Sequence, residues 1–278
     1  LMKKCFESNK GAGEQLNRRL MRDFRLYMLV GGMPQAVNEY IQTNNFRKVD
    51  AVKRDILKLY TDDFMKIDPT GKASMLFDAI PAQLNKNAAR YQVSSVLSTE
   101  RAEGLLELIA EMKDSKTVLV AYHANDPNVG LANNKDLSKF KLFICDTGLF
   151  TTLMFKDSDF TENTIYEKLL SDNLGTNLGY LYENVIAQIL TANGNELFYH
   201  TIQNEASRHS YETDFLITRK GKICPIEVKS SNYRTHKSID AFCEKYSSRI
   251  LNKYLIYTKD FSKDKDIFCL PVYYSQFI

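Results

Sequence analysis

The chain of 278 residues carries 37 Lys and Arg against 34 Asp and Glu, and 44% of its residues are hydrophobic. This balance is that of a globular protein with two or three small domains. No window approaches about 18 uninterrupted apolar residues, which excludes a membrane span. No apolar segment follows the basic start at residues 1–13, which excludes a secretory signal. We therefore expect a cytoplasmic protein without a membrane partner.

Cysteine and histidine form no recognisable metal or disulfide pattern. The five cysteines are odd in number, widely scattered and without a C-x-x-C pair. The four histidines, His123, His200, His209 and His236, form no H-x-x-x-H pair on a predicted helix. The sequence therefore predicts neither a disulfide framework nor a zinc site, and we expect each histidine to be a surface or loop residue.

Residues 1–70 are predicted to form a small helical unit. Apolar residues at helical spacing predict helices over 14–27, 34–43 and 46–66, and Pro and Gly in residues 68–72 mark the first boundary. The apolar stripe of the third helix consists of Val49, Val52, Ile56, Leu59 and Tyr60. The charged residues left outside that stripe are Asp50, Arg54, Asp55 and Lys58.

Residues 71–158 are predicted to form a winged-helix-like domain. Helical segments at 74–84, near 93–98 and at 100–114 precede an extended segment at 116–124, and three helices that feed a β-hairpin are typical of that domain. The third helix is acidic, and phosphates repel acidic side chains, so we expect this domain to be a spacer or to contact a partner protein rather than to read a DNA groove. Its acidic residues are Glu100, Glu103, Glu107 and Glu111.

Residues 159–278 are predicted to form an α/β domain with a mixed sheet, which makes the chain α/β overall. An amphipathic helix over 176–194 ends at Asn193-Gly194, which suits a left-handed helix cap. The elements have the order α-β-β-β-α-β, with one more strand at the end. The predicted strands are 196–202, 212–218, 222–229, 252–258 and 267–274, and the second helix is 235–246.

The hairpin over residues 212–231 carries the most informative side chains. Side chains alternate along a strand, so Glu227 and Lys229 point to one face. If the turn is centred on Lys220-Gly221, cross-strand partners have residue numbers that sum to 441, which places Asp214 opposite Glu227. Opposed Cβ atoms lie about 5 Å apart, so the two carboxylates could share one cation.

Paired carboxylates beside a lysine suit metal-assisted phosphodiester hydrolysis. Asp214 and Glu227 are the predicted ligands of Mg²⁺, with Mn²⁺ as a substitute, and the ion would activate a water and neutralise phosphate charge. Lys229 is predicted to orient that water or stabilise the developing oxyanion, and Glu183 to complete the catalytic site. The alternative is a neutralised polar cluster on a surface hairpin, because this residue spacing often arises by chance.

Asp214, Glu227 and Lys229, with Glu183 on the preceding helix, resemble the PD-(D/E)xK restriction-endonuclease-like superfamily. The whole chain resembles the C-terminal region of a group of prokaryotic AAA-type ATPases. In that group a P-loop ATPase core is followed by a helical lid, a winged-helix region and a nuclease-like domain. The segments that carry the resemblance are 27–37, 56–64, 77–84, 140–150, 179–190 and the hairpin.

The chain departs from that group at "SNKGAGEQ" (8–15), which lacks the spacing and the Ser or Thr of a P-loop. We therefore expect no ATPase activity from this chain. The resemblance implies that it begins after an ATPase core, and that missing core is a predicted partner.

Two functional interpretations stay open, and with them whether the chain is an enzyme. The first is a DNA-associated nuclease-like module, because residues 218–265 carry 12 Lys and Arg against 5 Asp and Glu. The second is a non-catalytic regulatory or protein-interaction module of the same ATPase, which the acidic middle third favours. The predicted DNA phosphate contacts are Arg234, Lys237, Lys245, Arg249 and Lys253.

Overall fold

The computed structural model describes residues 1–86, 88–98, 104–158, 161, 163–171, 179–204, 210–231 and 233–278. The chain divides into two compact units, each assembled from separate segments. Unit 1 comprises Leu1–Met21, Val120–Lys141 and Asn177–Ile278, and unit 2 comprises Arg22–Leu119 and Leu142–Thr176. The sequence instead predicts three consecutive domains, 1–70, 71–158 and 159–278, and that division stays a prediction.

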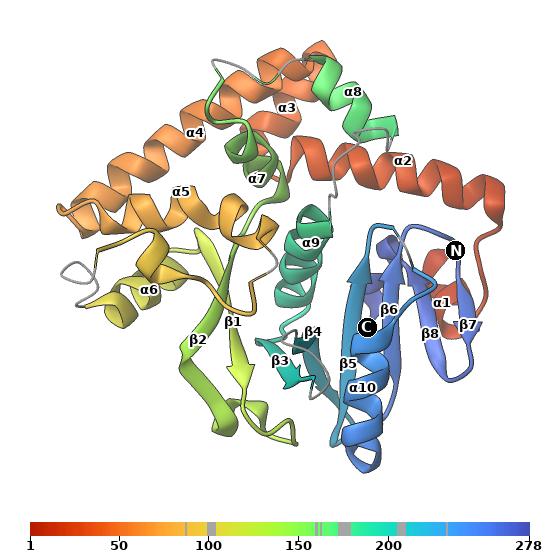
Figure 1. The fold of residues 1–278 in the computed structure, drawn as a ribbon. Coiled ribbons are helices and arrows are strands. Elements are labelled where there is room, and N and C mark those ends of the chain that lie inside the picture. The colour runs from red at the N-terminus through yellow and green to blue at the C-terminus, as the bar shows by residue number, and fades with distance from the viewer. Residues whose placement is uncertain are drawn as a thin grey trace. The chain divides into compact units, whose positions relative to one another are not determined.

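Helices dominate the N-terminal part of the chain and a mixed sheet the C-terminal part (Figure 1), which confirms the predicted α/β class. The helices are α1 (Met2–Glu7), α2 (Glu14–Val30), α3 (Pro34–Thr43), α4 (Phe46–Ile67), α5 (Lys72–Asn85), α6 (Leu105–Asp114), α7 (Thr147–Met154), α8 (Asn163–Ser171), α9 (Gly179–Ala192) and α10 (Lys237–Lys245). Short 3-10 helices are η1 (Val93–Ser95), η3 (Leu131–Asn134), η4 (Ser247–Arg249) and η5 (Val272–Phe277). Of the predicted third helix of the middle segment, residues 100–103 lie outside the described residues.

The strands form one mixed sheet in the order β2-β1-β3-β4-β5-β6-β8-β7. Pairing is parallel for β1 with β3, β5 with β6 and β6 with β8, and antiparallel for β3 with β4, β4 with β5 and β7 with β8. The predicted α-β-β-β-α-β order is present as α9-β3-β4-β5-α10-β6. The strands are β1 (Val118–Ala124), β2 (Lys135–Ile144), β3 (Leu197–Gln203), β4 (Ser210–Arg219), β5 (Lys222–Lys229), β6 (Lys253–Tyr257), β7 (Ser262–Asp264) and β8 (Ile267–Pro271).

The last predicted strand, 267–274, is wrong in its second half, because β8 ends at Pro271 and η5 follows. The two tyrosines of η5 instead anchor the N-terminal segment within unit 1. The Tyr273 hydroxyl donates to Asn17 Oδ1 at 2.9 Å, and the Tyr274 hydroxyl donates to the Lys10 carbonyl at 3.2 Å. These hydrogen bonds need a helical turn that presents both rings, which an alternating strand would not provide.

The turn between β4 and β5 fixes the register of the hairpin. Lys220 has φ 50° and Gly221 has φ 70°, and two positive φ values in a two-residue loop are those of a type I′ turn. Cross-strand pairs run from Arg219–Lys222 to Phe215–Ile226. Their residue numbers sum to 441, so the predicted register is confirmed over this ladder.

Replacing Gly221 with Ala is expected to lower the free energy of unfolding by about 1 kcal/mol, because an L side chain disfavours this positive φ. A Cβ atom at Gly221 would meet nothing within 4 Å, so the loss is conformational rather than steric. Gly221→Asn is the matched control and should lose less, since Asn tolerates this region. Urea denaturation of both variants measures the difference, and equal losses would contradict this account of the turn.

The core of unit 1 lies between α10 and the sheet. Buried apolar side chains of α10 pack against residues of β3, β4, β5, β6 and β8, while α9 contacts β3 and β5. Burial of such side chains stabilises the fold by about 1.5–3 kcal/mol each. The buried cluster includes Ile239, Phe242 and Cys243 of α10 with Phe198, Leu216, Ile223, Leu255, Ile267 and Cys269.

The stretch that lacks the P-loop pattern is held by a carboxylate of the same unit. Asp260 Oδ1 accepts from the Ala12 backbone N–H at 2.9 Å, and Asp260 Oδ2 accepts from that of Gly13 at 2.7 Å. A Cβ atom at Gly11 would lie 2.6 Å from the Asp260 carboxylate. A side chain at position 11 would therefore displace the Asp260 carboxylate from the Ala12 and Gly13 N–H groups.

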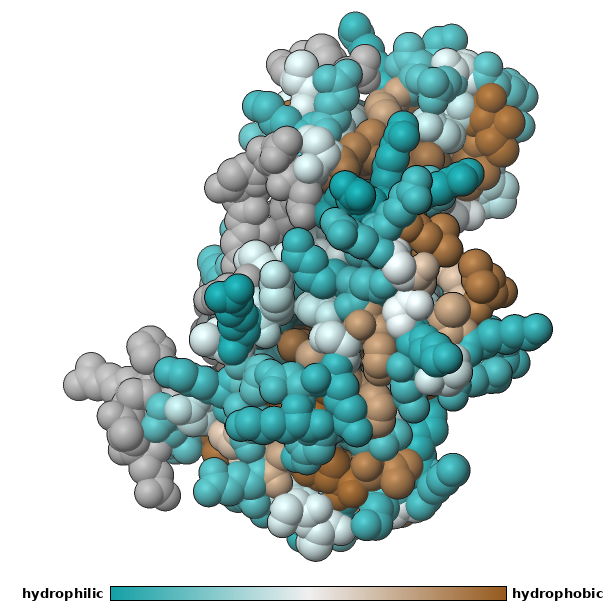
Figure 2. Space-filling model, turned by 90° about the vertical axis from the view of Figure 1, so that its right-hand side faces the viewer, coloured by the Kyte–Doolittle hydropathy of each residue, from teal (hydrophilic) through white to brown (hydrophobic). Residues whose placement is uncertain are grey.

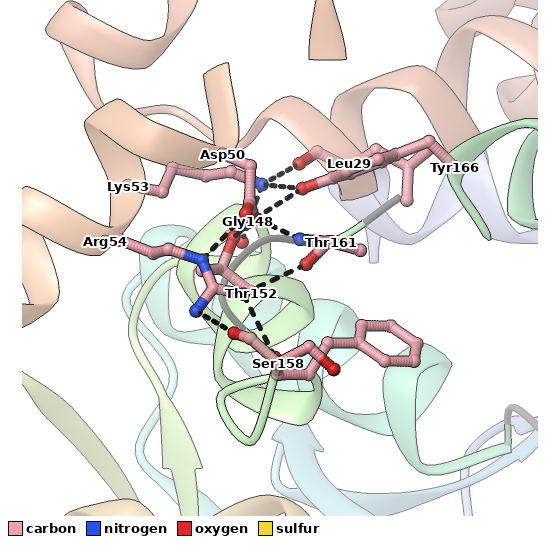
Figure 3. A network of polar contacts seen from close by, with 10 residues as sticks. Leu29, Asp50, Lys53, Arg54, Gly148, Thr152, Ser158, Thr161 and Tyr166 are labelled. Carbon is pink, nitrogen blue, oxygen red and sulfur yellow. Dashed lines mark hydrogen bonds and ion pairs between the residues drawn. The ribbon is translucent and has the colours of Figure 1, made fainter. Parts of the chain in front are cut away.

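In unit 2, α4 is the central helix and contacts α3, α5, α7 and α8. The prediction that Asp50 and Arg54 lie outside its packed face is wrong for Asp50, which is fully buried beside an equally buried Lys53. The predicted apolar stripe is also wrong at Leu59, which is 60% exposed. Asp50 and Lys53 lie on the face of α4 toward the segment that follows Leu142, because that segment supplies polar partners (Figure 3).

Asp50 and Lys53 form a hydrogen-bonded network with those partners. The Asp50 carboxylate accepts from Arg54 Nε at 2.8 Å and from the Thr152 hydroxyl, the Thr161 backbone N–H and the Tyr166 hydroxyl at 2.9 Å each. Burial alone would raise the Asp50 pKa, but these donors and the Lys53 charge hold it below its usual value. The network therefore keeps a buried carboxylate ionised.

Lys53 uses its donors on the same side of α4. Its Nζ donates to the carbonyls of Leu29 at 2.7 Å and Gly148 at 3.2 Å and to the Tyr166 hydroxyl at 3.1 Å. Burial lowers the Lys53 pKa to about 8, against the opposing charge of Asp50. Because its hydrogen bonds are satisfied inside the unit, Lys53 has a structural role.

No helix within the described ranges is long and apolar enough to cross a membrane. Figure 2 shows one face of the molecule, on which hydrophilic residues cover most of the surface and hydrophobic residues form scattered groups. Scattered apolar residues of this kind are normal on a protein surface. The most exposed large ones include Leu1, Ile41, Leu59, Leu106 and Val129.

Candidate functional site

Asp214 lies in β4 at the point where the pairing of this strand changes. Phe215, the next residue of β4, and Ile226 of β5 form the last pair of the β4–β5 ladder. Beyond that pair, the Val228 backbone N–H donates to Asp214 Oδ2 at 2.7 Å. On the other side, β3 pairs irregularly, and Asp214 and Phe215 together stand opposite the single residue Tyr199. This is a β-bulge, which bends the strand and redirects a side chain.

Glu227 of β5 is buried and held by two donors. Its Oε1 is 2.7 Å from Lys229 Nζ, and its Oε2 accepts from the Ile239 backbone N–H at 3.0 Å. Ile239 is in the first turn of α10, where backbone N–H groups have no partner within the helix. Glu227 thus caps a helix and pairs with Lys229 at the same time, and Lys229 lies on the predicted face.

Three further charged residues gather at this site. Glu183 comes from α9, Glu212 from β4 and Lys141 from β2, and Lys141 Nζ forms an ion pair with the Glu212 carboxylate. The charges of Glu183 and Asp214 both act on Lys141. The structure therefore brings the predicted residues Glu183, Asp214, Glu227 and Lys229 together, and it adds Lys141 and Glu212, which the sequence interpretation did not select.

The carboxylates of this site repel each other electrostatically. Burial, together with the charges of Glu183, Glu227 and Glu212, raises the Asp214 pKa well above its usual value. The Glu183 pKa is also raised, mainly by burial and against the Lys141 charge. Burial would lower the pKa of Lys229, but Glu227 raises it. Burial and mutual repulsion therefore disfavour the ionised forms of these carboxylates, a cost that a cation would relieve.

The donor set suits a hydrated divalent cation better than a protein cage. Among the residues that the structure describes, no three His, Cys, Asp or Glu side chains are placed to hold a metal ion. Mg²⁺ is commonly held by one or two carboxylates with several waters retained. Asp214 Oδ1 and the remaining lone pairs of Glu227 are hard oxygen donors of the kind that Mg²⁺ takes.

The five predicted phosphate-contact residues fall into two groups. Arg234, Lys237 and Lys245 are exposed. Arg249 instead pairs with Asp126 and donates to the Pro127 carbonyl at 2.8 Å, and Lys253 pairs with Asp266. The exposed group is accessible to phosphates, although Lys245 Nζ lies 5.4 Å from the centroid of the Tyr246 ring, whereas Arg249 and Lys253 would have to give up ion-pair partners.

The expectation that the histidines lie at the surface or in loops is wrong for His123 and His200, which are buried in β1 and β3 with ring centroids 5.2 Å apart. His123 Nε2 accepts from the Thr201 backbone N–H at 3.2 Å, so this nitrogen carries no proton. His200 Nδ1 lies 2.7 Å from the Ala124 carbonyl and donates to it, which leaves Nε2 to accept from the Tyr246 hydroxyl. The His123 ring is therefore neutral. Burial lowers the His200 pKa to about 4, so that ring is neutral at neutral pH as well. His209 lies outside the described residues.

Stability is expected to fall as the pH drops from about 6.5 toward 4. Burial lowers the His200 pKa to about 4 and also lowers the His123 pKa, so the unfolded chain binds more protons in this window. The His200 shift corresponds to a loss of about 3 kcal/mol by pH 4.

Urea denaturation across this pH range, for wild type and His200→Gln, measures that contribution. Lys245 and Asp126 act on His200, and Lys139, Asp136 and Glu212 act on His123, but all are retained in both proteins and cancel in the comparison. The variant should show the shallower acid loss. Identical pH profiles would contradict the assignment of a neutral buried His200.

The fold and the site together define a mixed α/β protein whose sheet carries a buried cluster of carboxylates and lysines. A family model described as "Domain of unknown function (DUF8612)" matches residues 21–159, half of the chain, and the chain belongs to that family. A second model, "Domain of unknown function (DUF4143)", matches residues 178–274. No curated protein and no solved structure is significantly similar to the chain.

Proposed function

We propose that unit 1 carries a Mg²⁺-dependent phosphodiester hydrolysis site formed by Asp214, Glu227, Lys229 and Glu183. The observation that carries the proposal is the placement of Asp214 and Glu227 at the open end of one hairpin, with Lys229 paired to Glu227. This hairpin belongs to the α9-β3-β4-β5-α10-β6 order that resembles restriction-endonuclease-like domains. The electrostatic cost of ionising Asp214 and Glu183 at this site supports the need for a cation.

Each residue has a distinct part in this chemistry. A divalent ion bound between Asp214 and Glu227 supplies Lewis acidity toward a phosphate oxygen and acidifies a water. Lys229 is held by Glu227 within 2.7 Å and places a positive charge beside the position of the attacking water or the developing oxyanion. Glu183, with its raised pKa, is suited to exchange a proton with that water.

DNA is the proposed substrate. Of the exposed basic residues, Arg234 and Lys237 lie at the start of α10, whose first turn is capped by Glu227, and Lys245 lies in its last turn. Basic side chains at such positions neutralise backbone phosphates and make binding salt-dependent. Domains of the DUF4143 family are often found C-terminal to AAA ATPases, which supports an ATPase core as a partner and a cytoplasmic location.

The test is cleavage of labelled single-stranded, duplex and branched DNA by the full chain, with Mg²⁺, Mn²⁺, Ca²⁺ or chelator. Cleavage that requires Mg²⁺ or Mn²⁺ is the expected result. Calorimetry with Mn²⁺ alone tests metal binding independently. A chain that neither binds Mn²⁺ nor cleaves any of these DNAs would sink the proposal.

The second candidate is a non-catalytic regulatory or interaction module of an ATPase. Two observations favour it. Both oxygens of Glu227 already accept from protein donors, and α6 presents the exposed acidic residues Glu107 and Glu111, which repel DNA and suit a protein partner. DNA binding without metal-dependent cleavage, or binding to a separately produced ATPase core alone, would favour this candidate.

A further inference from the structure

Lys141 reaches the carboxylate site from outside the α-β-β-β-α-β order. It lies on β2, while its ion-pair partner Glu212 lies on β4. Lys141 is only 6% exposed, and its Nζ is 5.4 Å from the centroid of the Tyr199 ring on β3. A lysine as buried as this one is costly unless an opposite charge compensates it, so its position follows from the carboxylates around it.

The charges of the site show what Lys141 compensates. Among the described residues, the site holds four carboxylates, on Glu183, Glu212, Asp214 and Glu227, and two ammonium groups, on Lys141 and Lys229. Lys229 is paired with Glu227. Lys141 is paired with Glu212, and its charge also acts on Glu183 and Asp214, which the charge of Lys229 reaches as well.

We propose that Lys141 is a positioning residue of this site, which fixes Glu212 and acts as a resident cation that holds Glu183 and Asp214 together before a divalent metal binds. The inference rests on the proposed function, because it assigns Asp214 to a metal. It adds a residue from a strand outside the predicted nuclease-like order, and it makes β2 a part of the site.

The proposal has a consequence that a purely structural lysine would not have. Lys141→Met keeps the unbranched aliphatic part of the side chain, shortened by one atom, and removes its charge, so Glu212, Glu183 and Asp214 repel each other more strongly. The metal-free protein then loses stability, and a divalent cation replaces more of the missing charge than it does in wild type. Lys141→Arg keeps the charge and should behave as wild type.

The experiment compares the thermal unfolding midpoint of the full chain with and without saturating Mn²⁺, for wild type, Lys141→Met, Lys141→Arg and Lys139→Met. Lys139 is the matched control, because it lies on the same strand and its ion pair is with Asp136 at 3.3 Å instead. The increase of Tm with Mn²⁺ is expected to be at least twofold larger in Lys141→Met than in the other three proteins.

The outcomes separate the two proposals. An equal Mn²⁺-induced increase in wild type and Lys141→Met would overturn the role of Lys141 and leave the metal site in place. No increase in any of the proteins would overturn the metal site itself, and the role of Lys141 with it. If Lys141→Met folds only when Mn²⁺ is present, the resident-cation role is supported. If it folds under neither condition while Lys141→Arg folds, the role is overturned, because Mn²⁺ should replace the lost charge.

Discussion

Lys229→Met is expected to lower metal-dependent DNA cleavage by about 10²- to 10³-fold, the usual cost of removing one preorganised group that stabilises charge in a transition state. Asp214→Asn should lower cleavage at least as far, because it removes a ligand of the cation. Single-turnover cleavage with Mg²⁺ in excess measures both effects. Lys222→Met is the matched control, since Lys222 lies on the same strand but is exposed beside the turn.

Stability distinguishes a catalytic loss from misfolding in these variants. The Asp214 pKa is raised by burial and by three neighbouring carboxylates, so its ionised form destabilises the metal-free fold at neutral pH. Asp214→Asn should therefore unfold at a higher temperature than wild type without metal, while it loses cleavage. Cleavage that survives in both Asp214→Asn and Lys229→Met would place the activity elsewhere.

Asp50→Asn is expected to lower the free energy of unfolding by about 3–5 kcal/mol, the range for removing one partner from a buried charge network. The new amide group would turn an N–H₂ toward donors that now meet a carboxylate, and Arg54 would lose its counter-charge at 2.8 Å. Urea denaturation followed by circular dichroism measures the loss, which belongs to unit 2.

Asp55→Asn is the matched control for this prediction. Asp55 is on the same helix and exposed, so the same substitution there should change the free energy of unfolding by no more than about 0.5 kcal/mol. A loss below about 1 kcal/mol for Asp50→Asn would mean that the network tolerates a neutral residue and contributes little to stability.

The hairpin was predictable because local rules determine it. Lys220-Gly221 fits a two-residue turn with positive φ, and strand alternation then places Glu227 and Lys229 on one face. The cross-strand pairing, in which residue numbers sum to 441, follows from the position of the turn alone. The bulge at Asp214 was not predictable, because it depends on how β3 pairs with β4. The residues of the β4–β5 hairpin do not determine which residues of β3 lie opposite them.

The missed residues are those whose partners lie far along the chain. Lys141 and Glu212 are 71 residues apart, and Asp50 and Thr161 are 111 apart. The helical pattern of α4 marks Asp50 as exposed because charge normally faces water, and only the polar segment that packs there reverses this expectation. Likewise His123 and His200 give no sequence signal of burial, since a strand buried on both faces does not alternate.

Asp260 lies 248 residues after Ala12 and 247 residues after Gly13, and its hydrogen bonds link these distant segments of the chain. Unit 2 lies wholly within residues 22–176, whereas unit 1 also needs residues 177–278, which are synthesised after them. During synthesis, unit 2 is thus able to fold before the partners of α1 in unit 1 have been made. Contacts of such long sequence separation slow folding, so the first turn of α2 and the carboxylate site are completed late.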